Sequence, residues 1–344
     1  EIASCLVGSE MCIRDSAKIG QNMDIKCVRR LIMIERRSFK VMLEWSIPSI
    51  SDGDWIRKII AESGNMGSDV SFANMYLLRE KYDIQICSYR GFLLRHYNGY
   101  YGRKGYTFPI GTGSQEKALQ ALKEDAKKRR EPLCFCLLTE EQKQMLEEVF
   151  PDTFVFESNP GDSDYIYSQE ELANLAGKAF HKKKNHFSKF VRTYPEYRFE
   201  QIGAANWQDA VLVEDMWYYE HLQEEDESQK KEYAAVKEAL EHFEQLELLG
   251  GLLYVNDTPA AMTVASYINE DTCDIHFEKA VGECVTNGAY AAINRLFAQT
   301  LNCKWLNREE DIGIEGLRKA KMSYHPKMLV KKYNAHLKTQ DIVE

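Results

Sequence analysis

Three consecutive strand patterns in the second half of the chain constrain its fold most strongly. Leu249–Val255 and Ala260–Ile268 are apolar runs on either side of the turn sequence Asn-Asp-Thr-Pro, and Thr272–Ala280 alternates apolar with polar residues. Short turns join neighbouring strands in antiparallel pairs, so this segment predicts a three-stranded meander. Such a sheet must bury a face against helices, and this requirement favours an α+β arrangement.

Helical patterns supply the layers around this sheet. Ser168 and Glu171 form a capping box, S-x-x-E, at the start of a long helix whose apolar stripe reaches Tyr194. Further helices are expected over residues 206–221, 230–246 and 288–300, with a short strand at 304–306. Before residue 160, helices alternate with mixed strands, which predicts a small α+β domain there.

The length of 344 residues suggests two domains. The turn cluster NPGDS at 159–163 is the expected boundary, and it divides the chain into 42–160 and 161–344. Residues 1–41 show no amphipathic period and no helix caps. We therefore expect a non-native or disordered leader there, with the ordered pattern beginning at Met42.

Charge and cysteine content narrow the classes of function. The net charge of −9 disfavours non-specific nucleic-acid binding, although a local basic patch could still hold a phosphate or an RNA end. The nine cysteines show no paired spacing, no CxxC motif and no Cys/His cluster, which predicts a reduced, cytoplasmic protein without a structural metal. The apolar runs are short and interrupted by charges, so no membrane-spanning segment is expected.

The most densely charged stretch is Asn307–Pro326, which carries four acidic and four basic side chains. Asp311 is expected to cap a helix that passes through Gly313. Arg318 and Lys321 are three residues apart and share one face of that helix. Two interpretations stay open, namely a solvated surface helix, which is common for charge runs, and an anion-binding face where glycine permits close approach.

Lys183 occupies an unexpected place in the apolar stripe of the long helix. Lys183 is four residues after Ala179 and four residues before Phe187, so it falls on the same helix face as these two residues. It is therefore expected to point inward while Lys182 faces solvent. An inward cation in a cleft suits a phosphate or a carboxylate. The alternative is a kink near Asn185 that leaves every lysine of the KKKNH segment exposed.

The third strand of the meander carries candidate acid–base residues. Strict alternation places Ile275 and Phe277 on one face of the sheet. It places Asp274, His276 and Glu278 on the other face. This polar face is either the solvated side of the sheet or a site of general acid–base catalysis in a cleft.

Three longer motifs carry a family resemblance: DYIYSQEELANLAGKAFHKKKNHFSKFVRTYP at 164–195, HFEKA at 276–280 and NREEDIGIEGLRKAKMSYHP at 307–326. They resemble the DUF2156 family, whose members are similar to the C-terminal catalytic domain of phosphatidylglycerol lysyltransferase. The resemblance covers residues 42–333 and implies two tandem GNAT-like domains, each a mixed, mostly antiparallel sheet flanked by helices. In the lysyltransferase relatives an aminoacyl group passes from tRNA to a lipid headgroup, and in the related Fem transferases to a peptidoglycan amine.

The GNAT resemblance also implies a place for an acyl donor, where two parallel strands splay and the phosphates meet the N-terminus of the following helix. That helix starts near Gly288 and Ala289, which are therefore candidate cofactor-binding residues. The family's usual Q/R-x-x-G-x-G/A loop is absent from the sequence AVGECVTNGA. Aminoacyl-tRNA or acyl-CoA is the implied co-substrate, with no tightly bound cofactor.

The resulting hypothesis is acyl or aminoacyl transfer to an amine or hydroxyl of a small-molecule, lipid-headgroup or peptide acceptor. Glu278, with His276 beside it, is the candidate base, and Tyr324 is the candidate leaving-group acid. Lys183, Arg318 or Lys321 would stabilise the oxyanion. The candidate substrate-binding residues are Lys182, Lys183, His186, Asn307, Arg308, Asp311, Gly313, Arg318 and Lys321.

Two other classes of function compete with transfer. A non-catalytic binding or regulatory protein with the same fold is the main rival, and the missing phosphate loop favours it. A hydrolase has little support, because the sequence contains neither GxSxG nor HExxH.

Overall fold

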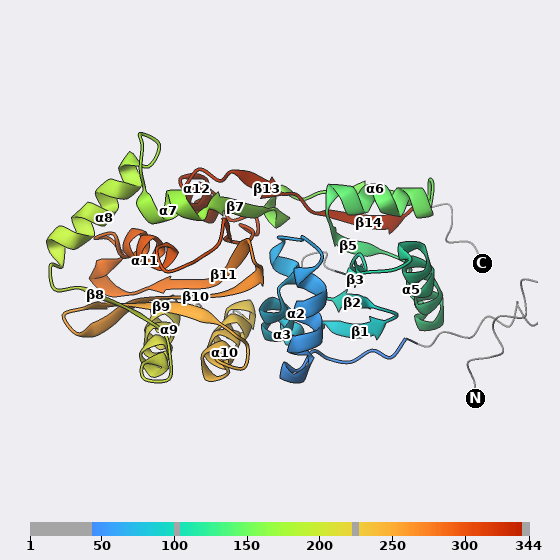
Figure 1. Ribbon diagram of the computed structural model, residues 1–344, viewed down its shortest axis with the longest axis horizontal. Helices are drawn as coiled ribbons and strands as arrows, with labels where there is room; N and C mark the ends of the chain where they lie inside the picture. Colours follow the sequence, from blue (N-terminus) through green and yellow to red (C-terminus); the bar gives the residue numbers. More distant parts are fainter. Residues whose placement is uncertain (1–42, 100–103, 222–226, 339–344) are drawn as a thin grey trace, which may run out of the picture. The chain divides into compact units, whose positions relative to one another are not determined.

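The computed structural model describes residues 43–99, 104–221 and 227–338 (Figure 1). The leader expected at 1–41 lies outside the described residues. The described chain forms two mixed β-sheets flanked by helices, which confirms the predicted α+β class. Within this part of the chain, every helix is too short or too polar to cross a bilayer.

The first sheet has the strand order β1-β2-β3-β5-β14-β6, with β4 beside β2. Its strands are β1 (Gln85–Tyr89), β2 (Phe92–Asn98), β3 (Lys104–Tyr106), β4 (Ile110–Gly111), β5 (Phe135–Leu138), β6 (Phe154–Glu157) and β14 (Tyr333–Leu337). The helices of this part are η2 (Ile50–Asp52), α2 (Gly53–Ala61), η3 (Ser68–Val70), α3 (Phe72–Leu77), α4 (Arg79–Tyr82), α5 (Gln115–Arg129) and α6 (Glu140–Val149). Strand β3 runs parallel to β5, and the other pairs are antiparallel.

The second sheet has the order β13-β7-β12-β11-β10-β9-β8 and contains the predicted meander. Its strands are β7 (Asp164–Ser168), β8 (Arg198–Gln201), β9 (Leu249–Val255), β10 (Thr258–Asn269), β11 (Thr272–Ala280), β12 (Trp305–Asn307) and β13 (Met328–Val330). The helices are η4 (Pro160–Asp162), α7 (Gln169–Asn174), α8 (His181–Thr193), α9 (Trp207–His221), α10 (Glu227–Glu241), η5 (Gly282–Cys284), α11 (Ala289–Ala298) and α12 (Glu315–Met322). Strand β11 runs parallel to β12, which brings Asp274 opposite Asn307.

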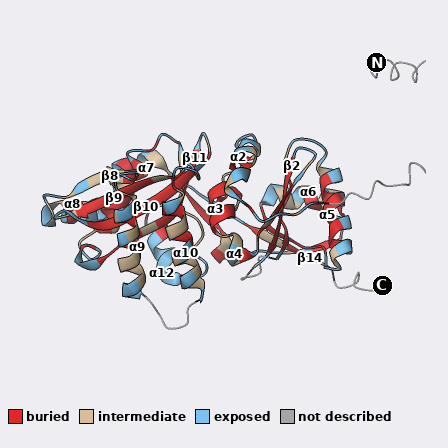
Figure 2. Ribbon diagram, turned by 90° about the horizontal axis from the view of Figure 1, so that it is seen from below, coloured by how far each residue is buried: buried red, intermediate tan, exposed pale blue. Residues whose placement is uncertain are grey.

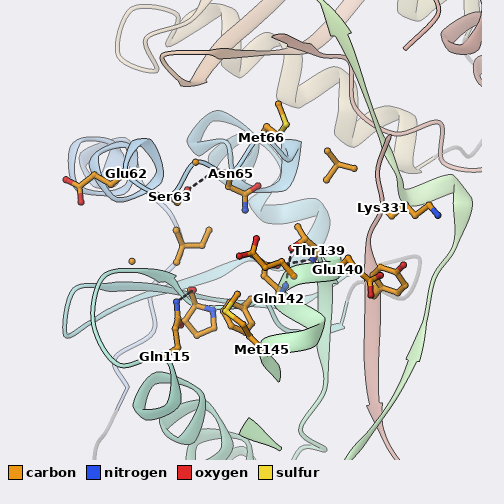
Figure 3. Close-up of a pocket in the computed structure, with 18 of the residues that line it drawn as sticks. Glu62, Ser63, Asn65, Met66, Gln115, Thr139, Glu140, Gln142, Met145 and Lys331 are labelled. Carbon is orange, nitrogen blue, oxygen red and sulfur yellow. Dashed lines mark hydrogen bonds between the residues drawn. The ribbon is translucent and has the colours of Figure 1, made fainter. Parts of the chain in front are cut away.

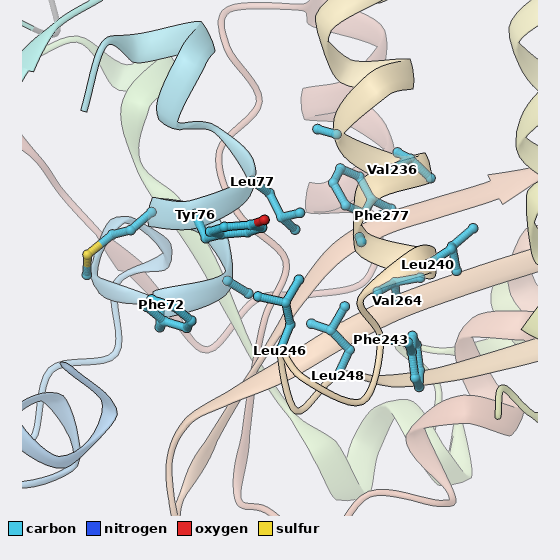
Figure 4. Packing of buried hydrophobic residues seen from close by; sticks show 14 of the residues in the cluster. Phe72, Tyr76, Leu77, Val236, Leu240, Phe243, Leu246, Leu248, Val264 and Phe277 are labelled. Carbon is cyan, nitrogen blue, oxygen red and sulfur yellow. The ribbon is translucent and has the colours of Figure 1, made fainter. Parts of the chain in front are cut away.

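Helices cover both faces of the second sheet (Figure 1). Helices α7 and α11 lie on one face, where Leu172 and Phe297 share a buried cluster with Ile275. Helices α9 and α10 lie on the other face together with α2 and α3. Figure 4 shows Tyr76 of α3 packed in one cluster with Leu240 and Phe277. The helices before the first sheet therefore share a core with the second sheet.

The last strand of the described residues, β14, lies in the first sheet. Strand β13 pairs with β7 at the edge of the second sheet, whereas β14 is inserted between β5 and β6. Residues that follow the expected boundary at 159–163 therefore complete the sheet that precedes it.

The predicted long helix is two helices, and the prediction of one continuous helix is wrong. Helix α7 starts after the N-cap Ser168 as expected, but Leu175 takes a left-handed conformation at φ 51° and α8 begins only at His181. Ala176 and Ala179 in the connecting segment are exposed. Apolar periodicity continues across this break by coincidence, so it gave no signal of the left-handed turn.

Strand β11 contains a β-bulge at His276. Ile275 and Phe277 pair with consecutive residues of β10, which leaves His276 as the extra residue. The bulge breaks the alternation, so Ile275 packs on the α11 face and Phe277 on the α10 face. The prediction that Asp274, His276 and Glu278 share one face is therefore wrong, because Glu278 lies on the opposite face from the other two.

Candidate functional site

Four of the predicted site residues converge on the α11 face of the second sheet. Arg308 Nη2 donates a hydrogen bond to Glu278 Oε1 at 2.9 Å. The Arg308 guanidinium lies 4.9 Å from the ring centroid of Tyr324, and Lys183 Nζ lies 3.8 Å from the same centroid. We call Lys183, Glu278, Arg308 and Tyr324 the ring cluster, because the tyrosine ring joins its two cations.

The ring cluster is held by elements far apart in the sequence. The bulge in β11 directs Glu278 toward α11, where Asn294 Nδ2 donates to Glu278 Oε2 at 3.3 Å. Arg308 follows β12, and its backbone N–H donates to the carbonyl of Tyr165 on β7. Tyr324 follows the end of α12. Lys183 lies in the first turn of α8, as the predicted inward position requires, and Lys182 is exposed.

Burial and neighbouring charges shift the pKa values of three residues of the ring cluster. Desolvation and the Arg308 charge lower the pKa of Lys183 to about 8, although Glu278 acts in the opposite direction. Burial raises the pKa of Tyr324 to about 12, so its hydroxyl keeps its proton at neutral pH. Burial acts to lower the pKa of Arg308, but the Glu278 carboxylate outweighs it and the pKa is raised. Both cations are therefore charged near pH 7.

Two donors of the ring cluster have no partner among the described residues. Arg308 Nη1 is buried without a hydrogen bond. Lys183 Nζ makes its ring contact with Tyr324 and no hydrogen bond or ion pair with another described residue. A buried cationic donor without an acceptor is costly, and it suits a bound anion or an oxygen that develops negative charge. The ring cluster thus combines two cations with a neutral phenol and the Glu278 carboxylate.

The other predicted cations lie elsewhere. Arg318 forms a two-pronged ion pair with Asp311, with Nε–Oδ2 at 2.8 Å and Nη2–Oδ1 at 2.9 Å. Asp311 also accepts from the Tyr165 hydroxyl at 2.6 Å and from the Gly313 backbone N–H at 2.8 Å. Helix α12 has Ile314 as its N-cap, so the expectation that Asp311 caps it is wrong. Asp311 instead anchors the preceding loop.

Lys321 and Asn307 are also held by contacts within the fold. The buried Lys321 Nζ donates to the backbone carbonyls of Arg308 and Glu310, which fixes the loop before α12. The fully buried Asn307 donates to Asp164 Oδ2 at 3.1 Å and to the Met66 carbonyl at 2.8 Å. Both residues thus position the loop that carries Arg308.

His276 lies away from the ring cluster, on the face of the sheet that packs against α3. Its Nε2 is 2.8 Å from Ser266 Oγ, and its Nδ1 is 3.4 Å from Asp274 Oδ2. The predicted pairing of His276 with Glu278 is therefore wrong. The bulge that separates the two side chains could not be inferred from alternation.

The N-terminus of α11 is covered by α8. Gly288 is the N-cap with φ 101°, and a Cβ at this position would lie 2.4 Å from the carbonyl oxygen of His186. Ala289 is fully buried behind it, and the His186 side chain is exposed. The close approach that this glycine permits is to the α8 backbone, so the geometry does not favour the pyrophosphate site predicted at Gly288 and Ala289.

Replacing Gly288 with alanine should destabilise the fold by about 1–3 kcal/mol more than the matched change Gly282→Ala, because a new methyl group would collide with a backbone oxygen. Gly282 also has a positive φ, 65°, but nothing lies within 4 Å of its Cβ position. The control therefore carries the same kind of backbone strain without the collision. Urea unfolding of both variants measures the difference, and equal midpoints would contradict the packing role.

Sequence reasoning missed two residues of the site, Asn294 and Tyr167. Asn294 lies in the apolar stripe of α11 and contacts Glu278. The ring of Tyr167 lies 5.8 Å from the Arg308 guanidinium, and its hydroxyl donates to the Lys321 carbonyl. A polar residue inside an apolar helix stripe was the available signal for Asn294, since buried polar groups require partners.

A separate pocket of about 740 Å³ opens beside the N-terminus of α6 (Figure 3). Its wall includes Glu62 and Asn65 from the segment after α2, Glu140 from α6, and Lys331 from the segment between β13 and β14. No residue of the ring cluster lines it. Figure 2 shows that α8 and α12 are largely exposed.

Comparisons with known proteins identify relatives of this chain. A family model described as phosphatidylglycerol lysyltransferase, C-terminal, matches residues 60–336. The crystal structure of a conserved protein of unknown function from Bacteroides thetaiotaomicron is 35% identical, with a TM-score of 0.82, and the match covers 86% of this chain and 100% of that one. This confirms the predicted DUF2156 resemblance.

More distant structures share the fold. L-PGS of Bacillus licheniformis is 13% identical with a TM-score of 0.61, over 86% of this chain and 94% of that one. FemX is 7% identical with a TM-score of 0.53, over 87% and 98%. An uncharacterised protein of Mycoplasmoides gallisepticum is 25% identical over 175 residues, which are 50% of this chain and 55% of that relative. The chain thus matches little more than half the length of this curated relative.

Proposed function

The chain belongs to the family described as phosphatidylglycerol lysyltransferase, C-terminal, and on that premise we propose that it transfers an aminoacyl group from a tRNA ester to an amine or hydroxyl acceptor. The observation that supports this most is the pair of unpartnered cationic donors, Lys183 Nζ and Arg308 Nη1, around the neutral Tyr324 ring. Ester aminolysis develops negative charge on the carbonyl oxygen, which such donors stabilise.

The proposed reaction forms a bond from the acceptor nitrogen or oxygen to the aminoacyl carbonyl carbon and breaks the bond from that carbon to the ribose oxygen of tRNA. Lys183 and Arg308 bind the oxyanion of the tetrahedral intermediate. The Tyr324 hydroxyl gives its proton to the departing ribose oxygen and regains one from the acceptor, so the acceptor proton ends on tRNA. This role for Tyr324 fits a phenol whose pKa is held above the neutral range.

Glu278 takes a different role from the base predicted for it. Its two carboxylate oxygens accept hydrogen bonds from Arg308 and Asn294. A carboxylate with both oxygens engaged in this way orients the guanidinium. We therefore assign Glu278 as a positioning residue for Arg308.

Aminoacyl-tRNA is the preferred donor over acyl-CoA, because the His186 carbonyl faces the α11 N-terminus where a CoA pyrophosphate would bind. The test incubates the full chain with tRNA charged with labelled amino acids or with labelled acetyl-CoA. Phosphatidylglycerol vesicles, a lysine-containing peptide and buffer alone are the acceptor arms. Label should move from tRNA to one acceptor. Label moving only from acetyl-CoA, or from neither donor, would overturn the proposal, and the second outcome would favour the non-catalytic alternative.

Donor binding should weaken as the pH rises through about 8, because Lys183 loses its proton there. The lowered pKa means that the ammonium is fully present below this value and absent above it. Lys183→Arg keeps its charge to higher pH and should remove the loss between pH 7 and 9. Fluorescence anisotropy with an amide-linked aminoacyl-tRNA, which resists hydrolysis, measures the affinity. The same pH profile in both proteins would contradict the assignment.

A further inference from the structure

A second cluster lies on the other face of β11, away from the ring cluster. It consists of Asp274 and His276 on β11 and Glu309 just after β12. One ligand atom from each residue lies within 4.8 Å of the other two. The parallel pairing of β11 with β12 brings Glu309 beside the strand, and the bulge presents the imidazole. The side chains of Asp274 and His276 are fully buried, and that of Glu309 is 24% exposed.

The spacing inside this cluster is long for hydrogen bonds, although His276 Nδ1 and Glu309 Oε1 do form one at 3.4 Å, and it matches the separation of ligands around a shared cation. His276 Nδ1 is 3.4 Å from Asp274 Oδ2 and 3.4 Å from Glu309 Oε1. Protein N–H···O hydrogen bonds usually measure about 2.7–3.2 Å. Ligands at about 2.0–2.1 Å from a tetrahedral metal are separated from one another by about 3.3–3.4 Å. The opposite ring nitrogen lies 2.8 Å from Ser266 Oγ, which is the kind of contact that orients a metal-binding histidine.

The cluster also holds more acceptors than donors. Asp274 Oδ1 is buried without a hydrogen-bond partner among the described residues. The two amide hydrogens of Asn74 face three acceptors, which are Asp274 Oδ2 at 3.2 Å, Glu309 Oε1 at 2.8 Å and the Ser68 carbonyl at 3.1 Å. An unpartnered carboxylate oxygen on a fully buried side chain is expensive unless a cation or proton meets it.

The cluster brings two carboxylates together beside one imidazole. Two carboxylates beside one imidazole would form a neutral unit with a divalent ion. A small cavity of about 20 Å³ borders the cluster on the side of Asn74, Glu309 and Glu310.

We propose that Asp274, His276 and Glu309 bind one divalent metal ion of the zinc or manganese class. One imidazole nitrogen and two carboxylate oxygens are ligands that these ions accept, with water completing the coordination. The ion holds the loop after β12 against β11 and α3. Because Arg308 precedes Glu309, the metal fixes the segment from which the Arg308 side chain reaches the opposite face. The site does not depend on the proposed aminoacyl transfer.

The test uses the full chain after dialysis against a chelator. Cobalt(II) is titrated while its visible absorption is recorded, and zinc binding is measured by calorimetry and by elemental analysis after gel filtration. Wild type should bind one equivalent of metal. His276→Gln and Glu309→Gln should each weaken binding at least about tenfold, because each removes a ligand. The exposed control Glu283→Gln should bind like wild type.

Failure of wild type to retain stoichiometric metal would overturn the proposal. Wild-type affinity in both His276→Gln and Glu309→Gln would also overturn it, because the metal would then lie elsewhere. If the buried histidine variant fails to fold, the partly exposed Glu309→Gln variant decides. A zinc-dependent rise in the melting temperature should accompany binding in wild type and in Glu283→Gln, and should be lost in Glu309→Gln.

Discussion

Lys332→Met should destabilise the protein by about 3–5 kcal/mol, because it leaves a buried carboxylate without its cation. Lys332 Nζ lies 2.8 Å from Asp164 Oδ1 and 3.2 Å from Asp69 Oδ1. The Lys332 side chain is 2% exposed and that of Asp164 is 0%. Lys332 also stands between β13 and β14, where the chain passes from the second sheet to the first. The ion pair therefore neutralises the buried carboxylate and also holds the segment in which the chain passes between the two sheets.

Two further variants separate the charge effect from general damage. The double change Lys332→Met with Asp164→Asn removes the unpaired charge and should recover part of the lost stability. Lys338→Met breaks an exposed pair with Asp152 and should cost no more than about 1 kcal/mol. Urea unfolding followed by fluorescence gives all three values. A loss for Lys332→Met no larger than that for Lys338→Met would contradict the buried ion pair.

Arg308→Met should lower the rate of aminoacyl transfer at least about 100-fold, the effect usually seen when one oxyanion donor is removed. Arg308 supplies the buried unpartnered Nη1 and contacts both Glu278 and the Tyr324 ring. Arg192→Met, on the exposed part of α8, is the control and should leave the rate unchanged. Single-turnover rates with saturating donor measure the chemical step. A rate within threefold of wild type would show that Arg308 does not meet the reacting atoms.

The role of Glu278 can be read from the same assay. If it acts by orienting Arg308, Glu278→Gln should lower kcat with little change in KM. It should then have no further effect in the Arg308→Met background, because effects within one unit are not additive. A general base would instead lower the rate in both backgrounds. The double variant also removes the partly buried carboxylate that Arg308→Met leaves without its cation, so it serves as the folding check.

Local patterns predicted most of the elements. The helix over residues 206–221 and the meander follow from periodicity and turn chemistry, both of which act within a few residues. The inward position of Lys183 was predicted from steps of four residues, and the step from Lys183 to Phe187 lies inside α8. The same step extended backward failed at Leu175, because one left-handed residue ends α7 without disturbing the apolar spacing.

Local sequence patterns do not predict contacts between segments that are far apart in the sequence. The bulge at His276 is defined by its pairing with β10, so alternation assigned Glu278 to the wrong face. Two arginines ten residues apart were both candidates, and their partners decide their roles. Arg308 meets Glu278 in the ring cluster, whereas Arg318 is held by Asp311. The insertion of β14 between β5 and β6 likewise depends on partners that lie far away in sequence.

The central claim is that the ring cluster acts on an aminoacyl-tRNA ester, and one comparison between neighbouring lysines tests it most directly. Lys183 and Lys182 share a helix, but Lys183 faces the Tyr324 ring while Lys182 is exposed. The measurement is the single-turnover loss of label from aminoacyl-tRNA in the presence of acceptor. Lys183→Met should slow it at least about 100-fold, and Lys182→Met should leave it within twofold of wild type. Equal rates for the two variants would contradict the claim.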